Sequence, residues 1–241
     1  MLNFWDQIAK VGIVVVLACA LTACGGGGGG GSKNNPPRLR YLNASPDAGP
    51  LTFKLDSEPR ASGVTYPGVS PDLDTITQSD YDVSVSEDGG NDLDAQAVGF
   101  ANEKEYLVAA VGLEDFGVEF FKRLRLVMYE VNLTPPNGNR SRIYGLNGFI
   151  RVPGIDTPNI DLRTPGETPQ YKIENIAFAA VVSAEIDSST QTFIARRSGS
   201  DSEYATGTFT FEPGGVYVAV FAGIENAVGA QAPRIEFLRI N

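Results

Sequence analysis

The sequence predicts an all-β protein, and three observations support this class. Apolar and polar residues alternate with a period of two, for example in residues 51–55, 81–85 and 208–211. Clusters of Gly, Pro, Asn and Asp separate these stretches at short intervals, and no segment clearly keeps apolar residues at helical spacing for three turns. Each alternating stretch therefore predicts a strand with one buried face and one exposed face.

The N-terminal residues predict a targeting segment. An apolar stretch, residues 11–21, follows Lys10. It is shorter than the roughly 20 residues that a membrane-spanning helix needs, and its length suits the apolar region of a signal peptide. Residues 21–24 read Leu-Thr-Ala-Cys, which resembles the lipobox of bacterial lipoproteins. This resemblance implies a signal peptide over residues 1–23 and lipidation of Cys24 by acyl chains such as palmitate.

Residues 24–37 predict a flexible tether after the lipidated cysteine. Residues 25–31 are all glycine, and such a run has high backbone freedom and no side chains to pack. In the lipoproteins that the N-terminus resembles, aspartate after the lipidated cysteine retains the protein in the inner membrane. Gly25 stands at that position, so we expect a lipid-anchored protein of the bacterial cell envelope at the outer membrane.

The rest of the chain contains an internal repeat. Three pairs of segments match in the same order: 106–114 with 217–225, 123–127 with 234–238, and the Leu-Asn pair 42–43 with 146–147. We therefore predict two tandem immunoglobulin-like β-sandwich domains, 38–132 and 141–241, joined by a linker over 133–140. A small barrel in each half is the alternative.

The start of the first predicted domain resembles a known family. Residues 38–47 read Arg-Leu-Arg-Tyr-Leu-Asn-Ala-Ser-Pro-Asp, and residues 51–56 read Leu-Thr-Phe-Lys-Leu-Asp. A basic strand, an Ala-Ser-Pro-Asp turn and a strand that ends in Asp resemble the opening of the bacterial domain-of-unknown-function family 4397 (DUF4397). Residues 214–217 resemble a later Gly-x-x-Tyr strand of that family, whereas residues 103–106 lack its glycine. The resemblance implies extracytoplasmic β-domains on tethers or in arrays, with no assigned activity.

The composition excludes several classes of function. The chain contains no histidine, which removes Ser-His-Asp and Cys-His catalysis and His-ligated metals. Its formal net charge of −10 gives no attraction for a nucleic-acid backbone. The Ser-Pro-Asp run at 45–47 lacks a suitable base, so it predicts a turn rather than a nucleophile. We therefore expect a protein that is not an enzyme and binds no nucleic acid.

One acidic segment, residues 72–94, is the candidate for a metal site because it contains no basic side chain. Its end, 88–94, places oxygen ligands on a glycine-bearing loop, as Ca²⁺ requires. The candidate ligands are Asp88, Asn91, Asp92 and Asp94. The alternative is a solvated turn between two strands, where Gly and Asp are favoured for conformational reasons.

Phe116, Phe120 and Phe121 lie close together near the predicted end of a strand. Such a group most often belongs to a core, although exposed rings can also stack on a sugar or contact a partner. The sequence as a whole predicts a lipid-anchored envelope protein that binds or spaces a protein or glycan at the outer membrane. Two alternatives stay open: a polysaccharide hydrolase that uses paired carboxylates, and a calcium-dependent adhesion module.

Overall fold

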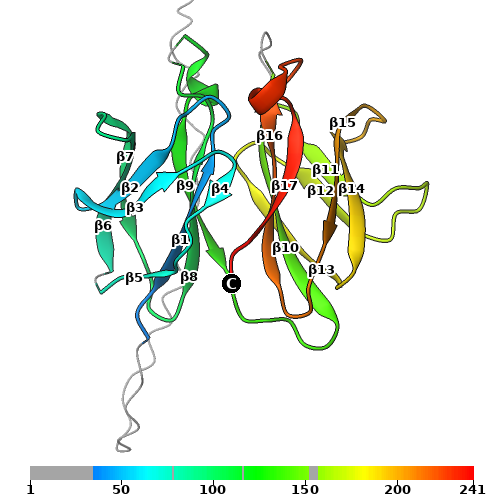
Figure 1. Ribbon diagram of the computed structural model, residues 1–241, viewed down its shortest axis with the longest axis horizontal. Coiled ribbons are helices and arrows are strands. Elements are labelled where there is room, and N and C mark those ends of the chain that lie inside the picture. Colours follow the sequence, from blue (N-terminus) through cyan, green and yellow to red (C-terminus); the bar gives the residue numbers. More distant parts are fainter. Residues whose placement is uncertain (1–34, 78, 116, 152–156) are drawn as a thin grey trace, which may run out of the picture. The chain divides into compact units, whose positions relative to one another are not determined.

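A computed structural model describes residues 35–77, 79–115, 117–151 and 157–241 of the chain. Within these ranges the chain forms strands and two short 3-10 turns, without an α-helix (Figure 1). The all-β class predicted from the alternation is therefore confirmed. The described part contains no helix with the length and apolar character of a membrane span. The predicted signal peptide, Cys24 and the glycine run lie outside the described residues.

The first nine strands form two sheets that pack face to face, which we call sandwich 1. These strands are β1 (Arg38–Ala44), β2 (Leu51–Leu55), β3 (Glu58–Val64), β4 (Gly68–Val69), β5 (Asp74–Thr75), β6 (Asp80–Glu87), β7 (Asp92–Gly99), β8 (Glu105–Val111) and β9 (Arg125–Val131). One sheet has the order β3-β2-β6-β7, and the other has the order β4-β1-β8-β9 with β5 also paired to β1. Tyr41, Phe53 and Val85 are buried between the two sheets, as the alternation predicts.

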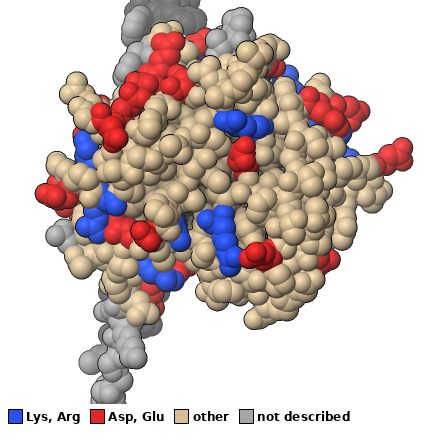
Figure 2. Space-filling view, in the orientation of Figure 1, with Lys and Arg blue, Asp and Glu red and all other residues tan. Residues whose placement is uncertain are grey.

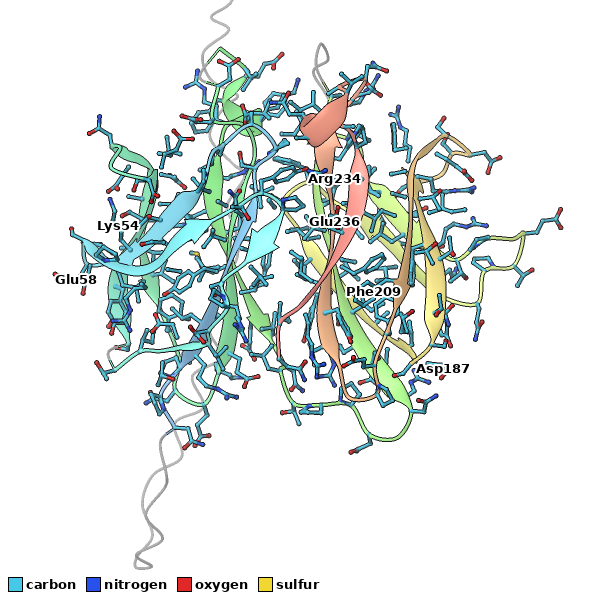
Figure 3. All side chains as sticks on the ribbon, viewed as in Figure 1. Lys54, Glu58, Asp187, Phe209, Arg234 and Glu236 are labelled. Carbon is cyan, nitrogen blue, oxygen red and sulfur yellow. The ribbon has the colours of Figure 1, made fainter. Side chains whose placement is uncertain are left out.

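The remaining strands form a second pair of sheets, which we call sandwich 2. These strands are β10 (Arg140–Ile150), β11 (Ile160–Arg163), β12 (Lys172–Ile176), β13 (Val181–Asp187), β14 (Thr190–Arg197), β15 (Glu203–Thr210), β16 (Val216–Ile224) and β17 (Arg234–Arg239). The sheets have the orders β13-β10-β16-β17 and β12-β11-β14-β15. Aromatic rings dominate the core between them, where Phe209 packs against Phe211 and Phe237 (Figure 3).

A third core joins the two sandwiches. The sheet that contains β1 and β8 packs on the sheet that contains β10 and β16, and both sheets contribute buried apolar side chains to the layer between them. This layer includes Leu42 and Leu107 from sandwich 1 and Leu146 and Val218 from sandwich 2. The four central strands are therefore buried on both faces, a situation that favours continuous apolar sequences over alternating ones.

Because of this third core, residues 34–241 form one compact unit. Strand β9 ends at Val131, before the predicted linker 133–140, and strand β10 begins at the last residue of that linker, Arg140. The division into domains 38–132 and 141–241 stays a prediction, as does their immunoglobulin-like character.

The strand register agrees with two of the three aligned segments. Asn43 of β1 lies opposite Ala110 of the parallel strand β8, and Asn147 of β10 lies opposite Phe221 of the parallel strand β16. These two pairs occupy equivalent positions in the segments that the sequence aligns. The two sandwiches are thus built on the same arrangement of central strands.

The third aligned segment is shifted in the structure. Arg125 lies opposite Val111, and Arg234 lies opposite Ala222. Arg125, rather than Arg123, is therefore the counterpart of Arg234. The sequence alignment is wrong here because the connection before β9 is longer than the connection before β17.

Asn43 ties three segments of sandwich 1 together. Its side chain is fully buried; Nδ2 donates to Gly49 O and Val64 O at 3.1 Å each, and Oδ1 accepts from Ser45 N at 3.0 Å. Buried amide groups need such partners because an unpaired one is costly.

Asn147 plays the same part in sandwich 2. Its Nδ2 donates to Pro158 O at 3.0 Å and Ile176 O at 2.9 Å, and its Oδ1 accepts from Phe149 N at 3.1 Å. The repeated Leu-Asn pair in the sequence thus marks a buried amide that ties a turn to a strand in each sandwich.

Two arginines make reciprocal contacts between the sandwiches. The Cζ atom of Arg125 in sandwich 1 lies 5.0 Å from the ring centroid of Phe178 in sandwich 2. In the other direction, the Cζ atom of Arg234 in sandwich 2 lies 5.0 Å from the ring centroid of Tyr66 in sandwich 1. Figure 3 labels Arg234 on β17. Because each sandwich gives an arginine and receives one, the interface resembles that of a symmetric dimer, in which both subunits use the same surface.

Replacement of either buried asparagine should destabilise the protein to a similar degree. Asn43→Ala and Asn147→Ala each leave two carbonyls and one N–H without partners, so we expect the free energy of unfolding to fall by about 3 kcal/mol. Urea denaturation measures this loss. Asn91→Ala, at an exposed turn, is the control with little expected change; unequal losses at the two buried sites would contradict their equivalence.

The reciprocal arginines should contribute equally to the contact between the sandwiches. Arg125→Ala and Arg234→Ala each remove one cation–π contact, so we expect each to lower the free energy of unfolding by about 1 kcal/mol. Arg163→Ala is a control, since Arg163 donates to Gly166 O on its own surface turn. Thermal melts of the three variants test the expectation, which fails if all three melt alike.

Candidate functional site

The connections β8–β9 and β16–β17 project from the same end of the two sandwiches (Figure 1). We call residues 112–115 and 117–124 tip 1, and residues 225–233 tip 2. Each contains a single 3-10 turn, η1 (Phe120–Lys122) in tip 1 and η2 (Gly229–Gln231) in tip 2. They occupy equivalent positions because β8 and β9 of sandwich 1 correspond to β16 and β17 of sandwich 2.

Both tips expose large apolar side chains. Phe120 is 83% exposed, Phe121 is 37% exposed and Val228 is 86% exposed. The prediction that the phenylalanines belong to a core is wrong for Phe120 and Phe121, and Phe116 lies outside the described residues. Large apolar side chains gathered at one end of a fold are found on surfaces that contact a partner, whereas single exposed ones are common.

Tip 1 is closed at its base. Leu113 and Leu124 are buried there, and Leu124 N donates to Leu113 O at 2.6 Å. Gly112 has a φ of 116°, and a Cβ at this position would lie 2.3 Å from Arg123 O. The close approach of the two backbone segments at the base therefore requires glycine at this position.

The Ala-Ser-Pro-Asp turn binds the backbone of tip 1 near its base. Asp47 Oδ1 accepts from Glu114 N at 2.9 Å, and Oδ2 accepts from Asp115 N at 3.2 Å. Ser45 Oγ donates to Asp47 Oδ1 at 3.2 Å. The aspartate of this motif therefore fixes the conformation of tip 1 by binding its backbone, a role that the local sequence does not reveal.

The basic side chains of tip 1 are turned toward the protein. Lys122 is fully buried, and its Nζ lies 3.1 Å from Glu119 Oε2. Arg123 Nε donates to Val118 O at 3.3 Å, and Arg125 Nη2 donates to Phe121 O at 2.8 Å. Lys122 is thus enclosed, while the partly exposed Arg123 and Arg125, the latter at the start of β9, bind the backbone of the tip.

The acidic side chains of tip 1 are exposed or half-buried. Asp115 and Glu119 are exposed, and a backbone N–H together with the Lys122 amine lowers the pKa of Glu119. Figure 2 shows acidic side chains gathered at the same end of sandwich 1. Tip 1 therefore combines exposed phenylalanines with a negative rim.

Equivalent positions at the base of the two tips carry different charges. Glu114 lies near Glu87 and Asp47, and burial followed by these two carboxylates raises its pKa. Its counterpart Glu225 instead forms an ion pair with Arg151, at 2.8 Å from Nε to Oε2. Sandwich 1 keeps like charges where sandwich 2 has a pair of opposite charges.

The predicted calcium ligands do not converge in the structure. Asp88 Oδ1 accepts from Thr52 Oγ1 at 2.8 Å, and Asp92 Oδ1 pairs with Lys54 Nζ at 2.8 Å. Asp94 Oδ2 accepts from Leu126 N at 2.7 Å and so binds the backbone of β9, while Asn91 is exposed. Among the described residues, no group of three His, Cys, Asp or Glu side chains could hold a metal. The calcium hypothesis therefore gains no support.

A cleft of about 500 Å³ in sandwich 1 contains a different set of polar groups. Arg60 donates to both oxygens of Asp74, at 2.6 and 2.9 Å, and Tyr41 OH donates to Asp74 Oδ2 at 2.7 Å. Burial and the neighbouring carboxylate raise the pKa of Tyr41. Because both Asp74 oxygens already accept hydrogen bonds, this group is better suited to stabilising the fold than to acid–base catalysis.

The carboxyl at the base of tip 1 should give stability an inverse pH dependence. A raised pKa of Glu114 means that its proton stabilises the fold below the usual carboxyl pKa and that this contribution is lost as the pH rises through the raised pKa. We therefore expect Glu114→Gln to raise the free energy of unfolding at pH 7 by about 0.3 kcal/mol, a small gain because solvent screens the site.

Glu225→Gln is the matched variant, since it breaks the ion pair with Arg151 and should lower stability at pH 7. Thermal melts at pH 4 and pH 7 compare the two variants. A loss of stability for both at pH 7 would contradict the like-charge assignment.

Comparisons with known proteins give a family and ten structural matches, of which two are described here. The family model described as "Domain of unknown function (DUF4397)" matches residues 37–157, and no curated protein matches the chain. The Bacillus anthracis TIE protein is 8% identical, with a TM-score of 0.26. The match covers 84% of this chain and 34% of the TIE chain, so this chain spans about a third of the length of that protein. CBMbc, a family CBM26 module of Eubacterium rectale Amy13K solved with maltoheptaose, is 11% identical with a TM-score of 0.26, over 84% and 96% of the two chains.

The family match includes the features that the sequence analysis singled out. It spans β1, the Ala-Ser-Pro-Asp turn and tip 1, and it continues through the whole of β10 to residue 157. The resemblance seen in the sequence is confirmed, and this chain belongs to the DUF4397 family.

Proposed function

We propose that this protein is a lipid-anchored component of the bacterial cell envelope, at the outer membrane, and that it acts as a non-catalytic binding module through tips 1 and 2. The observation that carries the binding role is the exposure of Phe120 and Val228 on equivalent connections at one end of the fold. A buried position would be favourable for both side chains, so their exposure is best explained by a partner that covers them.

The place where the tether joins the fold supports a binding role for the tips, because it lies at the opposite end of sandwich 1. Asn35 O accepts from Glu103 N at 2.8 Å, and Arg38 N donates to Lys104 O at 3.0 Å, just before β8 begins. Tip 1 follows the other end of β8, whose seven residues extend about 23 Å. A tether attached at residue 35 therefore leaves the tips at the end of the fold that is remote from the attachment point.

A non-catalytic role agrees with the chemistry of the chain. Without histidine, acid–base work would fall mainly to carboxylates. Those at the base of tip 1 and in the cleft of sandwich 1 already bind backbone N–H groups, arginine or tyrosine. Their partners stabilise the fold, which favours binding over catalysis.

Lipidation can be tested by the Cys24→Ala variant in cells that make the protein. We expect the wild-type protein to incorporate labelled palmitate and to sediment with outer membranes, whereas the variant loses the label and becomes soluble. Cys19→Ala keeps the cysteine of the lipobox and should behave as the wild type. A Cys24→Ala protein that remains membrane-bound would overturn the anchoring role.

A further inference from the structure

We propose that tips 1 and 2 form a single docking surface for a protein partner that offers an apolar pocket with a rim of lysine and arginine. This inference rests on the proposed binding role and names the class of partner. It does not depend on the lipid anchor.

The apolar part of the surface has the properties of a binding hot spot. Phe120 projects from η1, Val228 directly precedes η2, and Phe121 adds a partly exposed ring beside Phe120. An aromatic side chain that enters a dry pocket contributes strongly to affinity, and flanking contacts exclude water from it. Placement of Phe120 and Val228 on the same end allows one partner to cover both.

The backbone of each tip is held before any partner binds. In tip 1, Leu113 N donates to Lys122 O at 2.8 Å and Arg125 Nη2 donates to Phe121 O at 2.8 Å. In tip 2, Arg234 Nη2 donates to Ala230 O at 2.7 Å. A preformed loop loses little conformational entropy on binding, so more of the contact energy remains as affinity.

The charge near the tips indicates which residues should border the pocket of the partner. Asp115 is exposed beside the phenylalanines, and Glu114 lies near Glu87 and Asp47. The charge of Glu119 is balanced by the buried amine of Lys122. The arginines nearest the tips bind backbone carbonyls of the tips themselves, as described above. The carboxylates Asp47, Glu87, Glu114 and Asp115 thus lie on one side of tip 1, where they attract a surface rich in lysine or arginine and repel anionic lipids and nucleic acids.

Site-specific photo-crosslinking in intact cells tests the surface. p-Benzoylphenylalanine is introduced at Phe120, at Val228 or, as the control, at Val182, an exposed apolar residue of β13. We expect both tip positions to give an adduct with the same protein and Val182 to give none. The peptide that carries the cross-link should come from an apolar pocket bordered by lysine or arginine.

Variants of the tip test the two components separately. Phe120→Ser, with the cross-linker at Val228, should lower the adduct yield by about tenfold, as expected for an aromatic hot spot. Asp115→Asn keeps the acceptor for Gly117 N and removes the charge, so the yield should also fall and depend less on salt. Glu167→Gln, at an exposed position of sandwich 2, is the control, and unchanged melting temperatures show that the variants fold.

Several results would overturn the inference. These are equal adducts at Val182 and the tips, the absence of a protein adduct at the tips, or a yield that rises when the charge of Asp115 is removed. Another is binding of the purified protein, lost in Phe120→Ser, to immobilised peptidoglycan or to vesicles of phosphatidylethanolamine and phosphatidylglycerol. A stable partner that cross-links only at other faces would leave the binding role intact and refute the assignment to the tips, so the two failures are distinguishable.

Discussion

The apolar contact between the two inner sheets determines the rest of the architecture. Strands β1 and β8 of sandwich 1, and β10 and β16 of sandwich 2, are covered on both faces, so their side chains serve two cores at once. Loss of this contact would expose a continuous apolar sheet on each sandwich. The hydrophobic effect therefore favours residues 34–241 as a single unit, although the chain is a repeat of one β arrangement.

The approximate twofold relation between the sandwiches has a functional consequence. It places equivalent connections at the same end of the fold, and it allows each position in one sandwich to be compared with its counterpart in the other. Asn43 and Asn147 have the same role. Their neighbours at the next equivalent position differ, because Asp47 binds the backbone of tip 1 whereas Arg151 pairs with Glu225. The differences gather around tip 1, where sandwich 1 has the larger apolar side chains and the like charges. Stability alone does not require these features, and this is the physical reason to place the binding role there.

Tip 1 also shows how a loop can be both exposed and well defined. Its basic side chains and the carboxylate of Asp47 bind its own backbone, and its glycine at position 112 allows the two chains at its base to approach closely. These hydrogen bonds hold the loop with few apolar contacts, so phenylalanine can remain outside the core without unfolding the loop. The amine of Lys122 is balanced by Glu119, whereas Glu114 has the like-charged neighbours Glu87 and Asp47, so that side of the tip is acidic.

Local alternation, turn residues and similarity along the chain were enough to predict the all-β class, the repeat and the family. The third core and the exposure of Phe120 could not be predicted in this way, because both depend on contacts between segments that are distant in sequence. The tertiary structure also decided that Asp88, Asp92 and Asp94 bind three different partners. Neighbouring acids in a sequence do not form a site unless the backbone turns them toward one point, and here the strands direct them to separate neighbours.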